Sequence, residues 1–252
     1  MWSELEVGGG RASSASEGHY LLTLPPVHRG YADAQIDDTH SLPRRSFRWS
    51  PPVHLSLRAR TSSPSPLGTL GFGFWNDPFA VSLGQGGAAR RLPAGPCAIW
   101  FFYGSPPNEL ALAPGAPARG WKAACLASPQ IPSLLLAPAA AAAALLAQVP
   151  VLRGPVLRAA LSSVAASEAA VGAGMQEWHQ YAIDWLPAEA IFLVDDKVVL
   201  RAPAPPRVPL GFVAWIDNQF AVVSPRAGFR FGVIPTDREQ WLEMEGLSLI
   251  KG

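Results

Sequence analysis

Two segments of this sequence place a tryptophan and an aspartate two residues apart, a spacing that could bind a cyclic polar ligand. An indole face offers apolar stacking, and a carboxylate offers two hydrogen-bond acceptors. Together they suit a sugar ring or a similar small ligand. A carboxylate pair could also do acid/base chemistry if burial or neighbouring charge raises one pKa. The candidate residues in these segments are Trp75, Asn76, Asp77, Trp215, Asp217 and Asn218.

Both segments alternate as strands do, with residues two apart on one face. Glycine precedes each tryptophan by four residues, at Gly71 and Gly211. If the strands are neighbours in one sheet, the two faces form one cleft, with Asp77 and Asp217 close together at one end. The alternative is that the indoles fill the core and both aspartates cap strand ends, a reading that Pro78 supports.

A third segment, residues 31–38, also alternates. Its polar face carries Tyr31, Asp33, Gln35 and Asp37. We interpret it as a half-buried strand, and a polar rim of the cleft is the alternative.

Composition excludes several classes of partner. The net charge is +1 and only 15% of the 252 residues are charged, so nothing indicates a nucleic-acid or anionic-membrane partner. No histidine or cysteine spacing indicates a metal, and no glycine-rich phosphate loop indicates a nucleotide, so we expect no cofactor. Pairing of Cys97 and Cys125 is left open, as is the oligomeric state. The start lacks a basic region followed by an apolar core, so we expect a cytoplasmic protein.

The order of strand-like segments predicts one β-sandwich domain over residues 1–252. Residues 1–18 are expected to be a loose terminus, and residues 131–174 a helical insertion beside the cleft. Within the insertion, residues 139–148 and 155–171 are expected to be helices. Four prolines interrupt the charge-free stretch that contains the insertion, which favours a soluble helical flank over a membrane span.

Several segments resemble family 16 glycoside hydrolases, which have a concanavalin A-like jelly-roll fold. The likeness covers most of residues 50–250 except 127–176, and it is carried by 53–60, by His179-Gln-Tyr-Ala-Ile-Asp-Trp185 and by Ile191-Phe-Leu-Val-Asp195. It implies an all-β, two-sheet jelly-roll sandwich.

One departure from that family bears on function. Its catalytic strand carries Glu-x-Asp-x-x-Glu, and a retaining mechanism needs two carboxyls about 5 Å apart. The corresponding strand here is Ala98-Ile-Trp-Phe-Phe-Tyr103, which has no carboxylate. The resemblance therefore implies a site that cannot hydrolyse by that mechanism, with an aromatic floor made by Trp100, Phe102 or Tyr103.

These observations leave three hypotheses for function. The first is a non-hydrolytic binding protein for a carbohydrate or other cyclic, partly apolar small ligand. The second is an isomerase, cyclase or lyase that uses Asp77 or Asp217 as acid/base on an apolar substrate. The third is a structural or partner-binding module.

Overall fold

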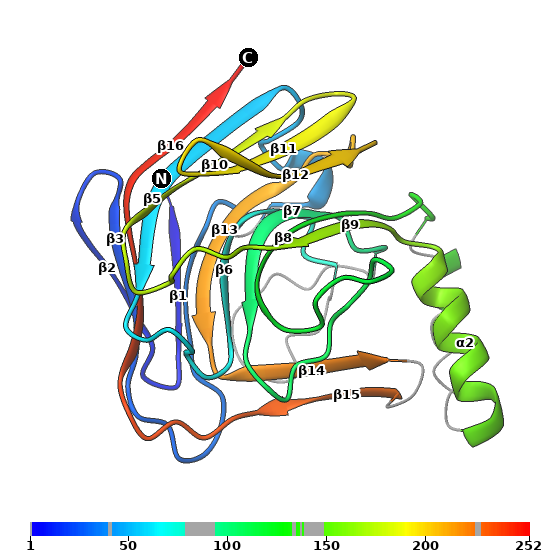
Figure 1. The fold of residues 1–252 in the computed structure, drawn as a ribbon, viewed down its shortest axis with the longest axis horizontal. Coiled ribbons are helices and arrows are strands. Elements are labelled where there is room, and N and C mark those ends of the chain that lie inside the picture. Colours follow the sequence, from blue (N-terminus) through cyan, green and yellow to red (C-terminus); the bar gives the residue numbers. More distant parts are fainter. Residues whose placement is uncertain are drawn as a thin grey trace.

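In the computed structural model, two seven-stranded antiparallel sheets pack face to face (Figure 1). The structure describes residues 2–39, 42–78, 94–132, 135–136, 138, 149–224 and 228–252. Sheet A contains, in spatial order, β1 (Ser3–Val7), β4 (Asp33–Asp37), β13 (Gly211–Asp217), β6 (Thr69–Trp75), β7 (Ala98–Gly104), β8 (Gly120–Ala127) and β9 (Ala165–Ala170). Sheet B contains β12 (Lys197–Pro203), β11 (Glu189–Val194), β10 (His179–Trp185), β5 (Val53–Thr61), β16 (Gln240–Lys251), β3 (His19–Leu24) and β2 (Arg11–Ser16). The expected all-β, two-sheet jelly-roll sandwich is confirmed.

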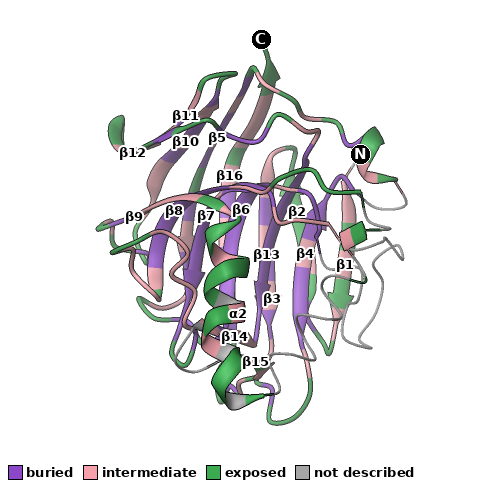
Figure 2. Cartoon of the chain, turned by 90° about the vertical axis from the view of Figure 1, so that its right-hand side faces the viewer, coloured by how far each residue is buried: buried purple, intermediate pink, exposed green. Residues whose placement is uncertain are grey.

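Four further elements of the described residues lie outside these sheets. β14 (Gln219–Ser224) and β15 (Gly228–Val233) form a two-stranded ribbon, η1 (Arg44–Ser46) is a short 3-10 helix, and α2 (Pro150–Ser162) is an α-helix. Figure 2 shows the exposed helix α2 in front of the buried strands of sheet A. Among the described residues, no helix has the length and apolar character needed to cross a membrane.

The core is built from the alternating apolar faces of both sheets. Phe72 and Phe101 of sheet A meet Tyr181 of sheet B at ring-centroid distances of 5.2 and 5.0 Å, and Phe74 meets Trp185 at 5.4 Å. Burying each of these side chains stabilises the fold by roughly 1.5–3 kcal/mol. Because one face of each strand is committed to this core, the opposite face is left for solvent or for a ligand.

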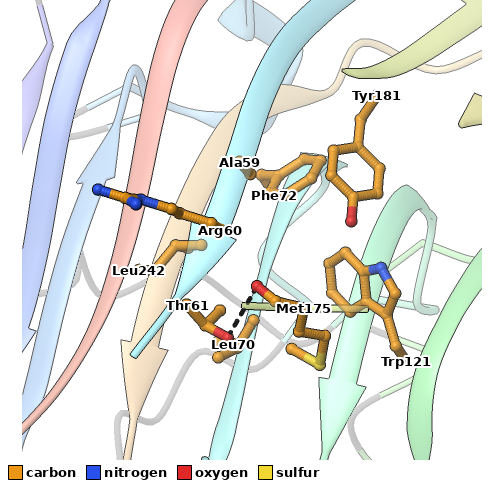
Figure 3. Close-up of a pocket in the computed structure, with 9 residues that line it drawn as sticks. All are labelled: Ala59, Arg60, Thr61, Leu70, Phe72, Trp121, Met175, Tyr181 and Leu242. Atoms are coloured by element: carbon orange, nitrogen blue, oxygen red, sulfur yellow. Dashed lines mark hydrogen bonds between the residues drawn. The ribbon is translucent and has the colours of Figure 1, made fainter. Parts of the chain in front are cut away.

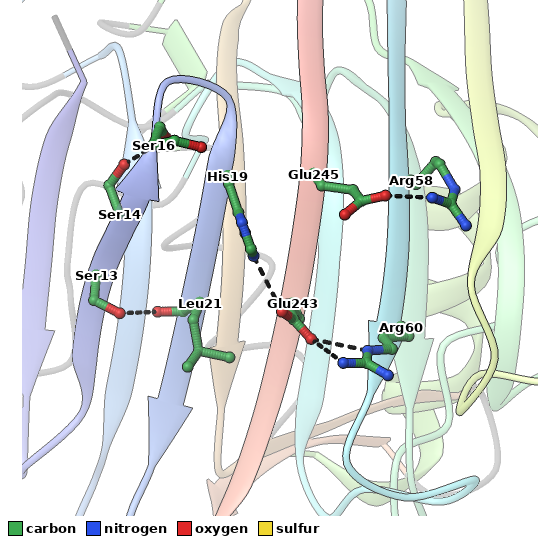
Figure 4. Close-up of polar contacts among 9 residues, drawn as sticks. All are labelled: Ser13, Ser14, Ser16, His19, Leu21, Arg58, Arg60, Glu243 and Glu245. Carbon is green, nitrogen blue, oxygen red and sulfur yellow. Dashed lines mark hydrogen bonds and ion pairs between the residues drawn. The ribbon is translucent and has the colours of Figure 1, made fainter.

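The outer face of sheet B carries a row of charged pairs across neighbouring strands (Figure 4). Glu243 pairs with both His19 and Arg60, and Arg58 pairs with Glu245. The Arg60 guanidinium also lies 4.7 Å from the ring centroid of Trp178. This face is therefore a solvated, charged surface.

Some local expectations were wrong. Residues 1–18 are not a loose terminus, because β1 pairs with β4 and β2 pairs with β3 at the sheet edges. The helix expected over 155–171 ends at Ser162, and β9 follows and pairs with β8. Sheet pairing therefore overrides the helix propensity of the alanines in 165–170. The helix expected over 139–148 lies outside the described residues. Cys97 and Cys125 are both buried free thiols.

Candidate functional site

The outer face of sheet A is arranged in rows set by the antiparallel register. The end row is Asp33, Asp217, Thr69, Gly104 and Gly120, and the second row is Gln35, Trp215, Gly71, Phe102 and Lys122. The third row is Asp37, Val213, Gly73, Trp100, Ala124 and Glu168, and the fourth is Gly211, Trp75, Ala98, Leu126 and Ala166. Polar groups therefore gather at the end row, and aromatic rings fill the middle of the sheet.

Four rings form a continuous surface that we call the aromatic face, defined as Trp75, Trp100, Phe102 and Trp215. Ring centroids lie 6.0 Å apart for Trp75 and Trp100 and 5.2 Å apart for Trp100 and Trp215. Phe102 lies 5.6 Å from Trp100 and 6.0 Å from Trp215. The site thus draws its rings from β6, β7 and β13.

Glycines in β6 make room for these rings. A Cβ on Gly71 would lie 2.8 Å from Cη2 of Trp215, and one on Gly73 would lie 2.7 Å from Cβ of Trp100. Gly73 also has φ +147°, which side-chain-bearing residues rarely adopt. The tryptophan side chains of the neighbouring strands therefore pack directly over the glycines of β6, where any side chain would clash with them.

Exposure changes along the aromatic face. Trp215 and Phe102 retain only 8% and 7% of their surface, whereas Trp75 and Trp100 are half-buried. The indole Nε1 of Trp75 has no hydrogen-bond acceptor among the described residues. A ligand would therefore meet Trp75 and Trp100 first.

A pair of buried carboxyl groups occupies the end row beside Trp215. Asp33 and Asp217 are cross-strand partners, so their side chains lie roughly 5 Å apart at Cβ. Asp217 Oδ1 accepts hydrogen bonds from the Thr69 backbone N–H (3.2 Å), Thr69 Oγ1 (2.8 Å) and the Gln219 backbone N–H (3.0 Å). Trp215 Nε1 donates to the same Thr69 hydroxyl at 3.0 Å, which links the carboxyl pair to the aromatic face.

Ionisation of both carboxyls at once is unfavourable, because the pair is buried and the two charges would repel each other. Burial raises the pKa of Asp217 to about 6, despite the hydrogen bonds that it accepts. Burial, and then the charge of Asp217, hold the pKa of Asp33 well above its ordinary value. Asp33 Oδ1 has no hydrogen-bond partner among the described residues. These features suit a single proton shared between the two carboxyls, as in coupled acid/base pairs.

The expected pairing of Asp77 with Asp217 is wrong. β6 and β13 are antiparallel, so Asp217 lies opposite Thr69 whereas Trp75 lies opposite Gly211. At about 3.4 Å per residue, the six steps from Thr69 to Trp75 separate the two ends of β6 by roughly 20 Å, and Asp77 follows the far end. Asp77 has φ +44°, and its carbonyl accepts from Arg44, so it shapes the chain beyond β6. The partner of Asp217 is Asp33.

Three other expected ligand contacts point elsewhere. Tyr103 lies in the core between the sheets, on the face of β7 opposite to Trp100 and Phe102. Asn76 binds the backbone at Gly95 and Cys97. Fully buried Asn218 binds the backbone at Gly30, Ala32 and Ile234. Both asparagines hold loops, because a buried amide must satisfy its own hydrogen bonds.

Trp75, Trp100, Phe102, Trp215 and Asp217 are brought onto one face as expected. Residues 31–38 contain the strand β4, as expected, and its pairing with β13 places Asp33 and Gln35 beside Asp217 and Trp215. Lys122, Glu168 and Leu110 were missed, because nothing local in the sequence indicates that they meet. No group of three metal-ligating side chains occurs in the part of the chain that the structure describes.

A small gap between the sheets offers no second candidate (Figure 3). It is lined mainly by core residues such as Phe72, Trp121 and Leu242, and it lies beneath Met175, whose carbonyl accepts from Thr61. It is therefore a packing gap in the core between the two sheets, separate from the aromatic face on the outer side of sheet A.

Comparisons with known proteins yield only distant structural likenesses. No family model and no curated protein matches the sequence. A legume lectin-like domain from Entamoeba histolytica is 8% identical, with TM-score 0.49, covering 100% of this chain and 90% of its own. An endo-β-1,4-glucuronan lyase from Trichoderma reesei is 11% identical, with TM-score 0.45, covering 100% of this chain and 88% of its own. The pseudo β-1,3-glucanase Rv0315 of Mycobacterium tuberculosis is 10% identical, with TM-score 0.45, covering 97% and 90%. Likenesses this distant transfer no function to this chain.

Proposed function

We propose that this protein binds a carbohydrate, or another cyclic ligand with apolar faces and polar edges, on the aromatic face without hydrolysing it. The observation that carries this proposal is the run of three neighbouring indoles on the outer face of sheet A, two of them only half-buried. Indole faces complement the C–H faces of a sugar ring, so Trp75 and Trp100 offer the stacking surface that such a ligand would meet first.

The geometry favours this function over a purely structural role. Rings needed only for packing lie between the sheets, as Phe72, Phe101 and Trp185 do. Trp75 and Trp100 instead lie on the outer face, where partial exposure costs hydrophobic free energy that a bound ligand would recover.

The test is a titration with cello- and laminari-oligosaccharides in which calorimetry and tryptophan fluorescence measure the binding affinity. We expect Trp100→Ala and Trp75→Ala to weaken binding about 5- to 150-fold, because losing a stacking anchor commonly costs roughly 1–3 kcal/mol. Trp178→Ala is the matched control, since this indole lies on the outer face of sheet B against Arg58 and Arg60. Full affinity with a lowered Tm in both variants would assign the rings to the fold alone.

A second candidate function is acid/base catalysis by the Asp33–Asp217 pair. The observation that favours it is the opposed, buried carboxyl pair with an unpartnered oxygen, joined through Thr69 to Trp215. Such a pair could take a proton at one carboxylate and return one from its neighbour, as an isomerase or a lyase requires. Turnover of a bound sugar that Asp33→Asn abolishes without loss of binding would establish this function in place of simple binding.

A further inference from the structure

A loop covers one end of the aromatic face. Residues 105–119 leave the end of β7 and return to the start of β8, and the loop runs across sheet A toward β14 (Figure 1). Leu110 packs against the cluster that Phe102, Val213 and Trp215 form. The Glu109 N–H donates to the Ala221 carbonyl at 3.0 Å, and the Val223 N–H donates to the Glu109 carbonyl at 2.8 Å. The 105–119 loop and β14 are therefore joined by backbone hydrogen bonds, and together they form a wall at this end of the aromatic face.

A buried ion pair fastens this loop to the sheet. Lys122 Nζ lies 2.5 Å from Glu168 Oε1, and the two side chains are only 3% and 2% exposed. Lys122 also donates to the Leu110 carbonyl at 2.5 Å and to the Pro117 carbonyl at 3.4 Å. Glu168 Oε2 accepts the backbone N–H groups of Leu112 and Ala113, each at 2.7 Å. Among the described residues, the other hydrogen bonds of these two side chains all go to the loop backbone.

This arrangement is costly as a source of stability alone. Removing two charges from water carries a large desolvation penalty, and well-packed apolar residues at such positions are often as stabilising. What an apolar pair cannot do is hold two backbone N–H groups and two carbonyls of an irregular loop in place. The pair is therefore better explained by the position that it imposes on the loop.

We propose that Lys122 and Glu168 are positioning residues that hold the 105–119 loop across one end of the aromatic face. A ligand then enters over Trp75 and Trp100, and only the terminal part of an oligosaccharide is bound. The proposal rests on the proposed function of this face. The exposure pattern supports it, since Phe102 and Trp215 are buried where Leu110 covers them, whereas Trp75 and Trp100 are half-buried. An oligosaccharide long enough to cross all four rows could bind only if Phe102 and Trp215 were also exposed.

The first test measures the loop without any ligand. Lys122→Met combined with Glu168→Leu removes both charges together. We expect the Leu112 and Ala113 amides to exchange hydrogen at least about 10-fold faster and acrylamide to quench tryptophan more strongly, with the Phe101 amide unchanged. Arg58→Met combined with Glu245→Leu is the matched control, because this ion pair lies on the outer face of sheet B (Figure 4). Unchanged loop exchange in the folded variant would overturn the proposal.

A second variant decides the case if the paired variant does not fold. Leu110→Ala leaves the ion pair intact and removes only the packing of the loop on Phe102 and Trp215. We expect stronger acrylamide quenching in this variant, and unchanged quenching would show that the loop does not cover these rings.

The ligand arm compares cellobiose with cellohexaose. The wild-type protein should bind both with similar affinity, whereas the paired variant should favour cellohexaose by at least about 10-fold, because opening the wall exposes two more rings. A strong preference of the wild type for cellohexaose would contradict a closed end. If neither sugar binds the wild type, the proposed function fails for these ligands, and the exchange measurement still decides the role of the ion pair.

Discussion

At the scale of single residues, the chemistry of the site is set by desolvation of the Asp33–Asp217 pair. Burial is the largest cause of the raised pKa at both carboxyls, and it raises that of Asp217 to about 6. A carboxyl whose pKa is higher in the folded state than in the unfolded chain binds its proton more tightly when folded. The free energy of unfolding should therefore fall as pH rises from about 4 through the folded-state pKa values.

Asp33→Asn should remove much of this pH dependence, because the amide is neutral at every pH. We expect the variant to be more stable than the wild type by about 1–3 kcal/mol at pH 8 and to differ little from it near pH 4. Urea unfolding at both pH values measures this. Asp237→Asn serves as control, since the Asp237 side chain is 91% exposed. An Asp33→Asn protein equally destabilised at both pH values would show that the carboxyl is needed for its hydrogen bonds.

At the scale of elements, β6 is the strand around which the site is built. Its inner face supplies Leu70, Phe72 and Phe74 to the core, while Gly71 and Gly73 leave its outer face free for the indoles of the neighbouring strands. A strand interior normally disfavours glycine. Here the missing side chains leave space over β6, and the side chains of Trp100 and Trp215 from the neighbouring strands occupy it.

Gly71→Ala should therefore disturb both fold and site. Its Cβ would lie 2.3 Å from the Phe101 carbonyl oxygen and 2.8 Å from the Trp215 ring. We expect a loss of about 1–3 kcal/mol of unfolding free energy, the usual cost of overpacking, together with a changed tryptophan emission spectrum. Gly172→Ala is the control, because nothing lies within 4 Å of that position. Equal stability of the two variants would mean that β6 tolerates a side chain beneath Trp215.

At the scale of the whole molecule, the two outer faces of the sandwich are chemically different. The outer face of sheet B carries charged pairs such as Arg60–Glu243, whereas that of sheet A carries the aromatic face. The outward positions of β7 are Ala98, Trp100, Phe102 and Gly104, so this strand places no carboxyl over the face.

We accordingly expect the purified protein to release no reducing sugar from laminarin or lichenan. A retaining glycosidase needs a nucleophile and an acid/base flanking the bound sugar, and β7 presents neither. A family 16 glycoside hydrolase assayed alongside is the positive control. Clear release of reducing sugar would overturn the non-hydrolytic part of the proposed function.

Alternation along the sequence predicted most strands of the two sheets, although not β1, β2 or β9, and indicated which side chains of a strand share a face. Alternation is local, so it predicted that Trp75 and Phe74 of β6 lie on opposite faces. For β7 the prediction left open whether Trp100, Phe102 or Tyr103 forms the aromatic floor, and the structure places Tyr103 in the core, on the face opposite to Trp100 and Phe102. A single site was expected only if β6 and β13 are neighbours in one sheet, and the sheet order shows that they are.

Which end of one strand meets which end of another follows from the direction of pairing in the folded sheet. Period-two alternation reads the same in both directions, so it cannot distinguish parallel from antiparallel pairing. Antiparallel pairing separates Asp77 from Asp217 and sets Asp33 opposite Asp217 instead. The Lys122–Glu168 pair depends in the same way on the pairing of β8 with β9, a contact between residues 46 apart that no local pattern encodes.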